Sequence, residues 1–456
     1  MKIDEILQLE VEKAIAKLRT KDISIPEWEE LKKMYEIKEH AIFDKIKRPA
    51  KVKKDGRIEE PTRIGLGLQK LAVKRLTQIL FSIPVKRVYY YENENKTQKE
   101  IVKAIEKIYE KAKINALNKR RSTELYACCE SATLWLLKKE ENSKYGFNSQ
   151  YKLRTKIFSP KLGDKLYPYF DETDDLIAFS IEYEVKEDDK KITYFETFTA
   201  DKLIKWRREK ESWEEVYNEK NIMSKIPIVY TSSGECLYED VSHLVDDLEL
   251  NLSNNGDVIA YNAAPLLEVK GDLIGDEDRH ESKRTIRVSD NGGVRYISWE
   301  QSVEAVKFQI DSALKFFFMQ LQLPDLSFEN VKGMGVVSGE SRKTLLTDAH
   351  LKAGDEIGMF EEMFEREFSI IKSYLKNMNK AWEREIDNID CSHIITPFIQ
   401  EDEKAEIEVL LKANGGNPIM SQRESIERFG YSDDVEETML EISREEQGRA
   451  TTDPFI

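Results

Sequence analysis

The residues of this chain that first suggest chemistry form a glycine-rich stretch followed by cations, Gly333-Met-Gly-Val-Val-Ser-Gly339-Glu-Ser-Arg-Lys343-Thr344. Such a stretch could cradle a phosphate group, as the Walker loop does with the pattern Gly-x-x-x-x-Gly-Lys-Thr/Ser. Here three residues separate Gly339 from Lys343, so the spacing does not fit. We therefore expect no nucleotide site, and we interpret the stretch as a hinge loop in which Ser338 or Ser341 is the N-cap of the next helix.

The cations of this stretch leave two interpretations open. Arg342 and Lys343 fall in the first turn of the expected helix, where the helix dipole disfavours positive charge. They are either chance surface charge or, together with Lys332, groups that face a polyanion. The candidate residues for contact with a polyanion are Lys332, Gly333, Gly335, Ser338, Arg342 and Lys343.

The chain offers no pattern typical of a metal site or a catalytic site. Neither of the acidic runs Asp171 to Asp175 and Asp272 to Asp278 combines the glycine with the distant glutamate of an EF-hand loop, so solvated surface is the favoured interpretation. The four cysteines match no zinc spacing, and the five histidines form no His-x-x-x-His pair. We expect no metal, no cofactor and no catalysis.

Composition limits the possible functions further. The chain has 456 residues, of which 40% are hydrophobic and 34% are charged, so it can form two to four domains with a sizeable core. No window approaches the eighteen uncharged apolar residues of a membrane span, and we expect no membrane partner. The net charge of −15 argues against tight binding of nucleic acid over a broad surface. It does not exclude a protein that lets nucleic acid pass without sticking.

The hinge loop lies inside a long helical unit, from Gln301 to Met378. Apolar residues at steps of three and four predict a helix that Leu323-Pro324 ends, because proline lacks an amide hydrogen. The period resumes at Leu345 and continues for roughly forty residues, or about 60 Å of helix. Gly354 and Gly358 permit close helix contact or a bend in it. The run Phe316-Phe-Phe-Met319 is interpreted as core or subunit interface.

The first 230 residues predict helices followed by strands. Ser24-Ile-Pro-Glu27 is interpreted as a capping box that opens a helix. A strand is expected at Val85 to Tyr91, and the stretch from Lys96 to about Glu130 is expected to be helical. From Ser131 to Tyr230 the period shifts towards two, which predicts antiparallel strands. Expected strands are Ala132 to Leu137, Leu153 to Phe158, Leu176 to Val185 and Ile192 to Phe198, with an edge strand at Ile226-Pro-Ile-Val-Tyr230.

A one-sided acidic helix comes next and leads into a small β module. Between Leu237 and Asn262 there are six acidic residues and no Lys or Arg. Strands are predicted at Leu266 to Lys270, Thr285 to Val288 and Val294 to Ser298, and Asp290-Asn-Gly-Gly293 predicts a hairpin between the last two. Because the module is inserted between two helices, its ends must lie close together. The two helices are then expected to be antiparallel neighbours.

The tail after Cys391 predicts mostly short helices. A strand is expected at Ile394 to Ile399, a helix through Ile407 and Leu411, another around Ile426, and an acidic helix from Asp433 to Glu446. The last ten residues show no pattern and are expected to be unstructured.

In this order of elements the chain resembles the portal proteins, or head-to-tail connectors, of tailed bacteriophages. The resemblance runs from about Val85 to Glu446, and its most specific part begins at Lys225-Ile-Pro-Ile-Val229. The acidic helix, the β module, an amphipathic helix, Pro324-Asp-Leu-Ser327 and Ser338-Gly-Glu at a long helix follow. Family members often have Ser-Gly followed by Val-Ala-Leu-Lys, whereas this chain has Glu340, Ser341 and Arg342.

The resemblance implies an α+β fold: an elongated portal-type subunit with long stem and wing helices, a small β clip module, an α+β wing and a mainly helical C-terminal crown. It assigns N-terminal helices and wing to residues 1–230, the first stem helix to 231–262, the clip to 263–300 and the second stem helix to 301–323. It further assigns a tunnel loop to 324–338, the long wing helix and a following strand region to 339–395, and the crown and tail to 396–456.

It also implies a ring, usually of twelve copies, at one vertex of a capsid assembled in the host cytoplasm. Double-stranded DNA would pass through the ring during packaging and ejection. The implied partners are the large subunit of the packaging terminase, a head-tail adaptor, and the major capsid and scaffolding proteins. The acidic stem residues Asp246, Asp247, Glu249 and Asp257 would line the channel, and Arg284, Arg287 and Arg295 would lie on the partner surface of the clip.

Two rival functions stay open on the sequence. A nucleic-acid-processing enzyme of a mobile element could use the long helix as an arm, but it requires a carboxylate cluster that binds magnesium. Another virion structural protein, such as a capsid or tail-adaptor protein, is the second rival.

Overall fold

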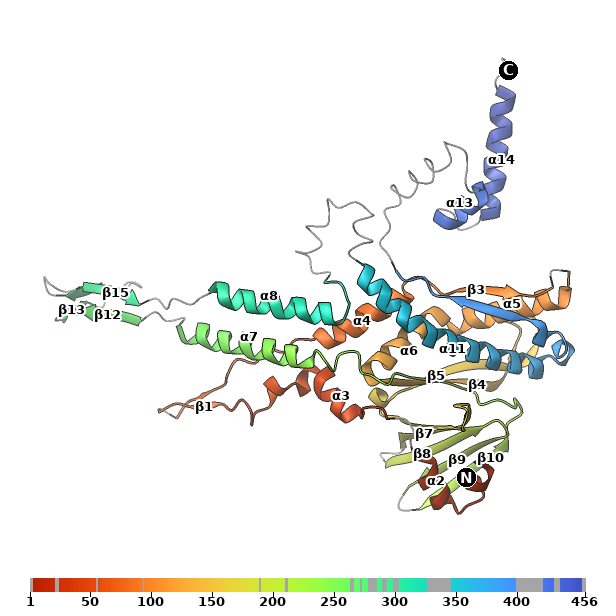
Figure 1. Ribbon diagram of the computed structural model, residues 1–456, viewed down its shortest axis with the longest axis horizontal. Helices are drawn as coiled ribbons and strands as arrows, with labels where there is room; N and C mark the ends of the chain where they lie inside the picture. The colour runs from red at the N-terminus through yellow and green to blue at the C-terminus, as the bar shows by residue number, and fades with distance from the viewer. Residues whose placement is uncertain are drawn as a thin grey trace. The chain divides into compact units, whose positions relative to one another are not determined.

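A computed structural model shows the chain in two units (Figure 1). Unit 1 is Met1–Leu326 with Leu346–Phe398, and unit 2 is Ser327–Leu345 with Ile399–Ile456. The residues that the structure describes are 3–20, 24–54, 56–92, 94–187, 190–209, 212–262, 266–270, 273–277, 285–288, 293–297, 303–325, 346–398, 421–429 and 435–452.

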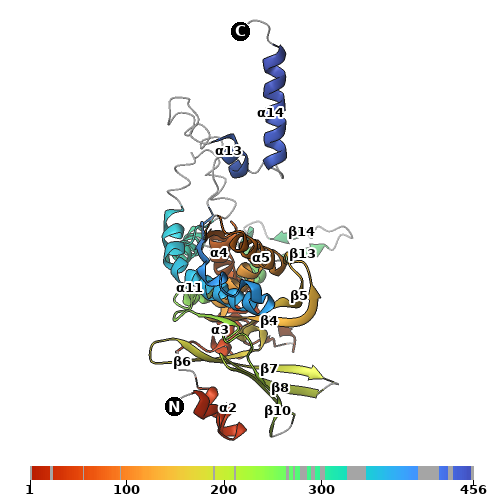
Figure 2. The same ribbon diagram turned by 90° about the vertical axis from the view of Figure 1, so that its right-hand side faces the viewer.

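The largest core of unit 1 is helical. Its helices are α3 (Trp28–Tyr35), α4 (Leu68–Phe81), α5 (Lys96–Ala112), α6 (Ile114–Cys128) and α11 (Thr347–Met378). Helix α11 packs against α4, and the two lie near each other in both views (Figures 1 and 2). Helix α4 packs against α6. The edge of Phe81 meets Phe360 with ring centroids 4.9 Å apart. The apolar period of α11 is confirmed, since its members from Ala349 to Leu375 are mostly buried in this core.

The helical stretch expected from Lys96 to about Glu130 forms two helices. Lys113 adopts a left-handed backbone with φ of 52°, which ends α5 and begins α6. Residues other than glycine adopt the left-handed conformation only at single positions, not over a run. The helix axis therefore changes direction at Lys113. The predicted stripe of Ile101, Ile105 and Ile108 is nevertheless buried along α5.

Two antiparallel sheets follow the helices. One has the order β11-β4-β5 and the other the order β10-β9-β8-β7-β6. Their strands are β4 (Glu130–Asn142), β5 (Ser149–Phe158), β6 (Lys165–Phe170), β7 (Leu176–Glu187), β8 (Lys190–Thr199), β9 (Lys202–Arg208), β10 (Trp213–Lys220) and β11 (Ile228–Ser232). The four predicted strands are present, and β11 is an edge strand next to the proline, as expected. Strands β6, β9 and β10 were not predicted; β10 is largely exposed and therefore carries little apolar alternation.

The N-terminal helices cover one side of the five-stranded sheet. Helices α1 (Ile3–Leu7) and α2 (Val11–Leu18) bury Ile6 and Ile15 against Phe195 and Trp206. The predicted capping box is wrong. Helix α3 begins at Trp28, and Glu27 is its N-cap without a side-chain hydrogen bond.

Short elements join these parts. Strand β3 (Lys86–Tyr90) pairs antiparallel with β16 (Asp390–Ile394), so the strand expected at Ile394 to Ile399 lies earlier in the chain. The 3-10 helices are η1 (Ile37–Glu39), η2 (Ala41–Phe43), η3 (Pro160–Leu162), η4 (Lys380–Trp382) and η5 (Ile386–Asn388). We use "arm" for residues 36–67, which contain η1, η2 and a two-stranded hairpin of β1 (Lys51–Val52) and β2 (Ile58–Glu59).

Two helices flank the β module. They are α7 (Ser242–Asn262) and α8 (Val303–Gln320), and we refer to them as the stem pair. The module contains β12 (Leu266–Lys270), β13 (Leu273–Glu277), β14 (Thr285–Val288) and β15 (Gly293–Ile297). The predicted hairpin between the last two strands is wrong, because β15 pairs with β12 and β14 pairs with β13.

Unit 2 contributes two described helices, α13 (Gln422–Phe429) and α14 (Val435–Thr452). A capping box precedes α13, since Ser421 Oγ accepts from the Glu424 amide at 3.1 Å and Glu424 Oε2 accepts from the Ser421 amide at 3.0 Å. Helix α14 continues to Thr452, so part of the last ten residues is helical rather than unstructured. The helix expected through Ile407 and Leu411 lies outside the described residues.

Candidate functional site

The stem pair is the centre of the candidate site. Helices α7 and α8 lie side by side in Figure 1 and contact each other. Gln309 Nε2 of α8 donates to Asp247 Oδ2 of α7 at 3.4 Å. The aromatic run at the end of α8 divides in two: Phe317 and Phe318 are buried, whereas Phe316 and Met319 are exposed. One side of α8 is therefore core, and the other side offers apolar surface.

The arm runs along α7 and takes up part of its acidic face. Three side chains of α7, four residues apart, accept hydrogen bonds from three alternate backbone amides of the arm. Glu249 Oε1 accepts from the Leu66 amide at 2.6 Å, Ser253 Oγ from the Ile64 amide at 2.9 Å, and Asp257 Oδ1 from the Thr62 amide at 2.6 Å. Four helical residues rise about 6 Å and two extended residues about 6.6 Å, so the spacings match. We call these three bonds the ladder.

Two basic side chains of the arm complete this contact. His40 Nδ1 lies 2.6 Å from Glu249 Oε1, and both side chains are buried. Arg48 bonds to Asn254 Oδ1 at 2.7 Å and to Asp257 Oδ2 at 2.5 Å. Burial opposes ionisation of Asp257, but bonds from Thr62 and the nearby Arg48 hold the pKa of its carboxyl below the usual value. The arm thus bonds to two of the stem acids within the same chain.

The four predicted stem acids therefore differ in their burial and in their bonds to the arm. Glu249 is 1% exposed and faces the arm, so the prediction that it lines a channel is wrong for this arrangement of the chain. Asp257 is half-buried beneath Arg48 and Thr62. Asp246 and Asp247 are exposed. The sequence held one signal for the arm contact that was missed: a basic stretch from Lys47 to Thr62 and an acidic helix without cations in the same chain.

The other predicted site residues are placed only in part. Arg287 lies on β14 opposite Gly275 of β13, and Arg295 lies on β15 opposite Glu268 of β12. The two arginines therefore belong to two different strand pairs. Arg284 and the whole loop set (Lys332, Gly333, Gly335, Ser338, Arg342 and Lys343) lie outside the described residues.

The end of α8 is fixed where that loop begins. Gln322 adopts a left-handed backbone with φ of 53°, and the Leu323 amide bonds to the Phe318 carbonyl at 3.0 Å. Arg75 of α4 donates to the Pro324 carbonyl, and its guanidinium lies 4.7 Å from the centroid of the Phe318 ring. Burial lowers the pKa of Arg75, and the nearby Asp325 opposes this effect. The helical core thus holds the last described residues before the loop.

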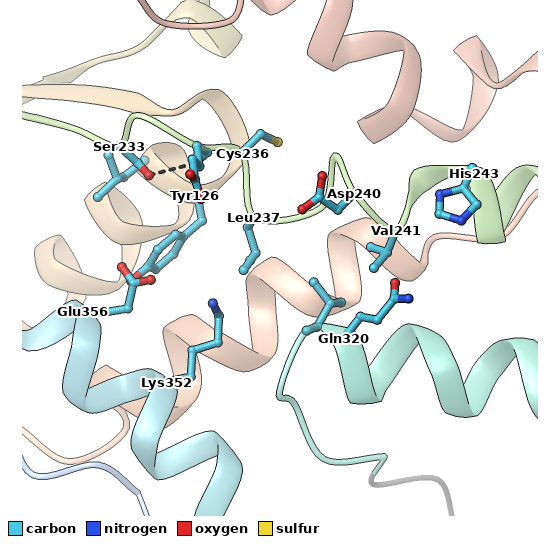
Figure 3. A pocket seen from close by; sticks show the side chains of 13 residues that line it. Tyr126, Ser233, Cys236, Leu237, Asp240, Val241, His243, Gln320, Lys352 and Glu356 are labelled. Carbon is cyan, nitrogen blue, oxygen red and sulfur yellow. Dashed lines mark hydrogen bonds between the residues drawn. The ribbon is translucent and has the colours of Figure 1, made fainter.

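A polar cavity of about 640 Å³ lies where the stem pair meets the helical core. Figure 3 shows Gln320 of α8, His243 of α7, and Lys352 and Glu356 of α11 around it. Tyr126 donates to Glu356 Oε2 at 3.1 Å, and burial raises the pKa of the Glu356 carboxyl. Ser233 Oγ donates to the Glu235 carbonyl at 2.8 Å. Tyr126, Glu356 and Ser233 are thus held by bonds within the chain, as in a structural joint.

An added Cβ at Gly354 or Gly358 of α11 would meet no atom within 4 Å. Within the described part of the chain neither glycine therefore makes a close helix contact, and the alternative of a bend stays a prediction. Among the described residues, no group of three or more His, Cys, Asp or Glu side chains could hold a metal ion. Within the same part of the chain, no helix is long and apolar enough to cross a membrane.

Comparisons with known proteins show what the chain is similar to. Two similar solved structures carry the titles "Virion of native gene transfer agent (GTA) particle" and "Neck of empty GTA particle computed with C6 symmetry". The first is 8% identical with a TM-score of 0.40 and covers 94% of this chain and 99% of that one. The second is 8% identical with a TM-score of 0.38 and covers 86% and 94%. No curated protein matches the chain.

The family comparison covers nearly the whole chain. The family described as "Phage portal protein, SPP1 Gp6-like" matches residues 16–452. This match includes the arm, both sheets, the stem pair, the β module and the helices that follow. The chain belongs to the SPP1 Gp6-like family of phage portal proteins.

Proposed function

We propose that the chain is one subunit of a ring, of twelve copies, at one vertex of a bacteriophage capsid. Double-stranded DNA passes through the ring during packaging and ejection. Family membership over residues 16–452 is the observation that carries the proposal. The role is structural: the ring guides DNA and holds partners, and the chain performs no catalysis.

Charge supports a channel through which DNA slides. Each copy carries a net charge of −15, and α7 has no cation. Because DNA phosphates are repelled by such a wall and tight binding needs many cations, the polymer would not adhere. With Glu249 and Asp257 engaged by the arm, Asp246 and Asp247 are the stem acids that we assign to the channel.

We assign the segment 324–338 to the channel loop, with Lys332, Arg342 and Lys343 as transient contacts to the phosphates. Deletion of residues 326–337 is expected to leave the ring intact and to impair DNA packaging in a complementation assay. Arg75 still holds Pro324 in that variant, so the stem pair keeps its anchor. Loss of the ring would contradict the assignment of the loop.

We assign the β module to partner binding, first to the packaging terminase and later to the tail adaptor. The positions that we assign to this surface are Arg284, Arg287 and Arg295. Charge reversal at Arg287 and Arg295 is expected to weaken capture of the terminase large subunit by purified rings at least tenfold. Equal capture by the variant and the wild type would contradict it.

The first experiment is to measure mass by light scattering and to image the same peak by negative-stain electron microscopy. Twelve chains of 53.2 kDa give a particle of about 640 kDa with an axial hole. A shell would instead favour another virion structural protein. Magnesium-dependent cleavage of DNA by the purified chain would favour a nucleic-acid-processing enzyme.

A further inference from the structure

The hairpin of the arm carries apolar side chains that its own chain leaves uncovered. Val52 and Ile58 are directly paired across β1 and β2, so they lie on the same face, and they are 73% and 70% exposed. Ile46, just before the hairpin, is 90% exposed. A two-stranded hairpin is marginally stable alone in water, and it gains stability when an apolar face is covered.

The hairpin is nevertheless held at a defined place on α7. The chain leaves α7 after Arg48 and returns at Thr62, and both residues bond to Asp257. The turn is closed by the Lys53 amide, which bonds to the Arg57 carbonyl at 2.9 Å, and Gly56 supplies a φ of +80°. Both ends of the segment that carries the hairpin are therefore tied to Asp257, three residues from each strand.

A second uncovered apolar patch lies at the same level of the stem. Ile259 and Tyr261 of α7 are 58% and 80% exposed, so the hairpin of the same chain does not cover them. They follow Asp257 by two and four residues, which is about 3 and 6 Å along the helix axis. The chain thus carries two different apolar patches at one level.

A ring requires two such patches. Neighbouring copies in a ring meet head to tail, so each contact joins two different surfaces of the same chain. Rotation about the ring axis keeps every atom at its height. In the proposed ring the stem helices run along the ring axis, so a hairpin tied to Asp257 lies near the height of Ile259 and Tyr261 of the next copy.

Charge agrees with this contact. Lys51 and Lys54 of the hairpin are exposed, whereas residues 237–262 contain six acids and no Lys or Arg. Within one chain, Arg48 already binds this helix through Asn254 and Asp257, which shows the match between cations of the arm and α7. The hairpin therefore meets no Lys or Arg that belongs to α7 of the next copy, and Asp257 there is already bound by Arg48 of its own chain.

We propose that the hairpin of residues 51–59 packs onto Ile259 and Tyr261 of the neighbouring copy and so ties adjacent stems together. Val52 and Ile58 make the apolar contact, and Lys51 and Lys54 face the acidic helix. This inference rests on the proposed ring, and it names the arm as one of the elements that join its copies.

The test joins two copies covalently in assembled rings. One chain carries Val52→Cys and the other Tyr261→Cys, and the two chains have different affinity tags. Both chains also carry Cys391→Ser, which removes the half-buried natural thiol; the other three cysteines are buried. The chains are expressed together, and rings are purified by size. A short bismaleimide then links thiols that lie close together. The expected product is a covalent heterodimer of about 106 kDa, twice 53.2 kDa, that carries both tags.

Val216→Cys replaces Val52→Cys in the matched control, since Val216 of β10 is also an exposed valine, at 48%. We expect at least tenfold more heterodimer with Val52→Cys than with Val216→Cys. Rings of full size in which the two variants give equal yields would overturn the arm contact and leave the proposed ring standing. Absence of rings from the wild-type chain as well would contradict the proposed function, and this inference with it.

Discussion

The helical core and the arm contact each bury one glutamate of a helix, but they satisfy it in different ways. In the core, Glu367 of α11 accepts from the two terminal nitrogens of Arg121, Nη1 at 2.8 Å and Nη2 at 3.1 Å. It also accepts from Trp135 Nε1 at 3.1 Å. In the arm contact, Glu249 uses a single oxygen for both His40 and the Leu66 amide. Its Oε2 and His40 Nε2 are buried without a hydrogen-bond partner among the described residues.

The difference shows two ways of holding a segment. Arg121 and Glu367 are each 1% exposed and form a bidentate pair inside apolar packing, with the guanidinium 5.3 Å from the centroid of the Phe364 ring. Both carboxylate oxygens are used, and Arg121 Nε is the atom of this pair that is buried without a partner among the described residues. Removing one member leaves a charge without a partner in a medium of low dielectric constant. The arm is held mainly by the hydrogen bonds of the ladder, which its backbone amides donate to α7. Each of these bonds can be removed separately by replacing one side chain of α7. We therefore expect the core to fail as a whole and the arm to be released stepwise.

The largest expected effect is on the core. Glu367→Ala leaves Arg121 buried without its carboxylate, and loss of one partner of a buried pair costs about 3–5 kcal/mol of unfolding free energy. Urea unfolding followed by circular dichroism measures the change. The exposed pair Arg207 and Glu214, with N···O 3.1 Å, is the matched control. Replacing both of its members by alanine is expected to cost less than about 1 kcal/mol.

A double variant sharpens this result. Arg121→Met with Glu367→Leu removes both charges and keeps most of the volume, so it is expected to recover a large part of the loss seen for Glu367→Ala. A double variant as unstable as Glu367→Ala would show that the apolar packing, and not the stranded charge, sets the cost.

The second effect is a dependence of core stability on pH. His393 is buried beside Phe364 and Phe368; burial first, and then Arg87 and Arg121, lower its pKa to about 4. The unfolded chain, with an ordinary pKa near 6.5, binds more protons between these values. Stability is therefore complete above about pH 6.5 and falls as the pH drops towards 4, by at most about 3 kcal/mol.

Unfolding free energies of the wild type and His393→Gln between pH 4.5 and 7 measure this slope. The variant is expected to show a flatter profile over that range. Replacement of the exposed His243 by glutamine is the control and is expected to keep the wild-type slope. Identical slopes for the wild type and His393→Gln would show that His393 does not cause the dependence of stability on pH.

The core was accessible from the sequence because apolar spacing reports burial. The period from Ala349 to Leu375 predicted α11 and its buried side, and the alternation from Leu176 to Val185 predicted β7. Where the pattern weakens, the prediction failed. Strand β10 is mostly exposed and shows no alternation, and the break at Lys113 depends on a left-handed backbone that no glycine announces.

The arm contact was not accessible, because it joins polar groups about two hundred positions apart. The ladder uses backbone amides, which carry no sequence signal, and one of its acceptors is a serine. In the sequence, a carboxylate of an acidic helix that faces water cannot be distinguished from one that bonds to the arm. The channel assignment of Glu249 failed for that reason, while the two stem helices were expected to be neighbours because the β module is inserted between them.

The third effect isolates one rung of the ladder. Ser253 is buried, and Ser253→Ala leaves the Ile64 amide without its acceptor, which costs about 1–3 kcal/mol. Because the arm is held separately from the core, the loss should appear as faster hydrogen exchange at residues 62–66 with little change in global unfolding. Leu250→Ala, at a position of the same helix that is 47% exposed, is the control and should leave the exchange of these amides nearly unchanged. A matching loss of global stability would contradict the separation of arm and core.

The smallest effect compares two glycines in helices of the two regions. Gly354→Ala in α11 meets nothing within 4 Å and should add about 1 kcal/mol of stability, the ordinary preference of a helix for alanine. Gly256→Ala in α7 brings the same preference, but its Cβ would lie 2.8 Å from Thr62 Cγ2 in the ladder. We therefore expect no gain in stability from Gly256→Ala, and faster cleavage of the arm by protease.

Adding Thr62→Ala to Gly256→Ala should slow that cleavage, because it removes the crowded methyl group while the hydrogen bond from the residue-62 amide to Asp257 remains. Equal stabilisation by both glycine variants would mean that the arm does not hold α7 as closely as the ladder requires.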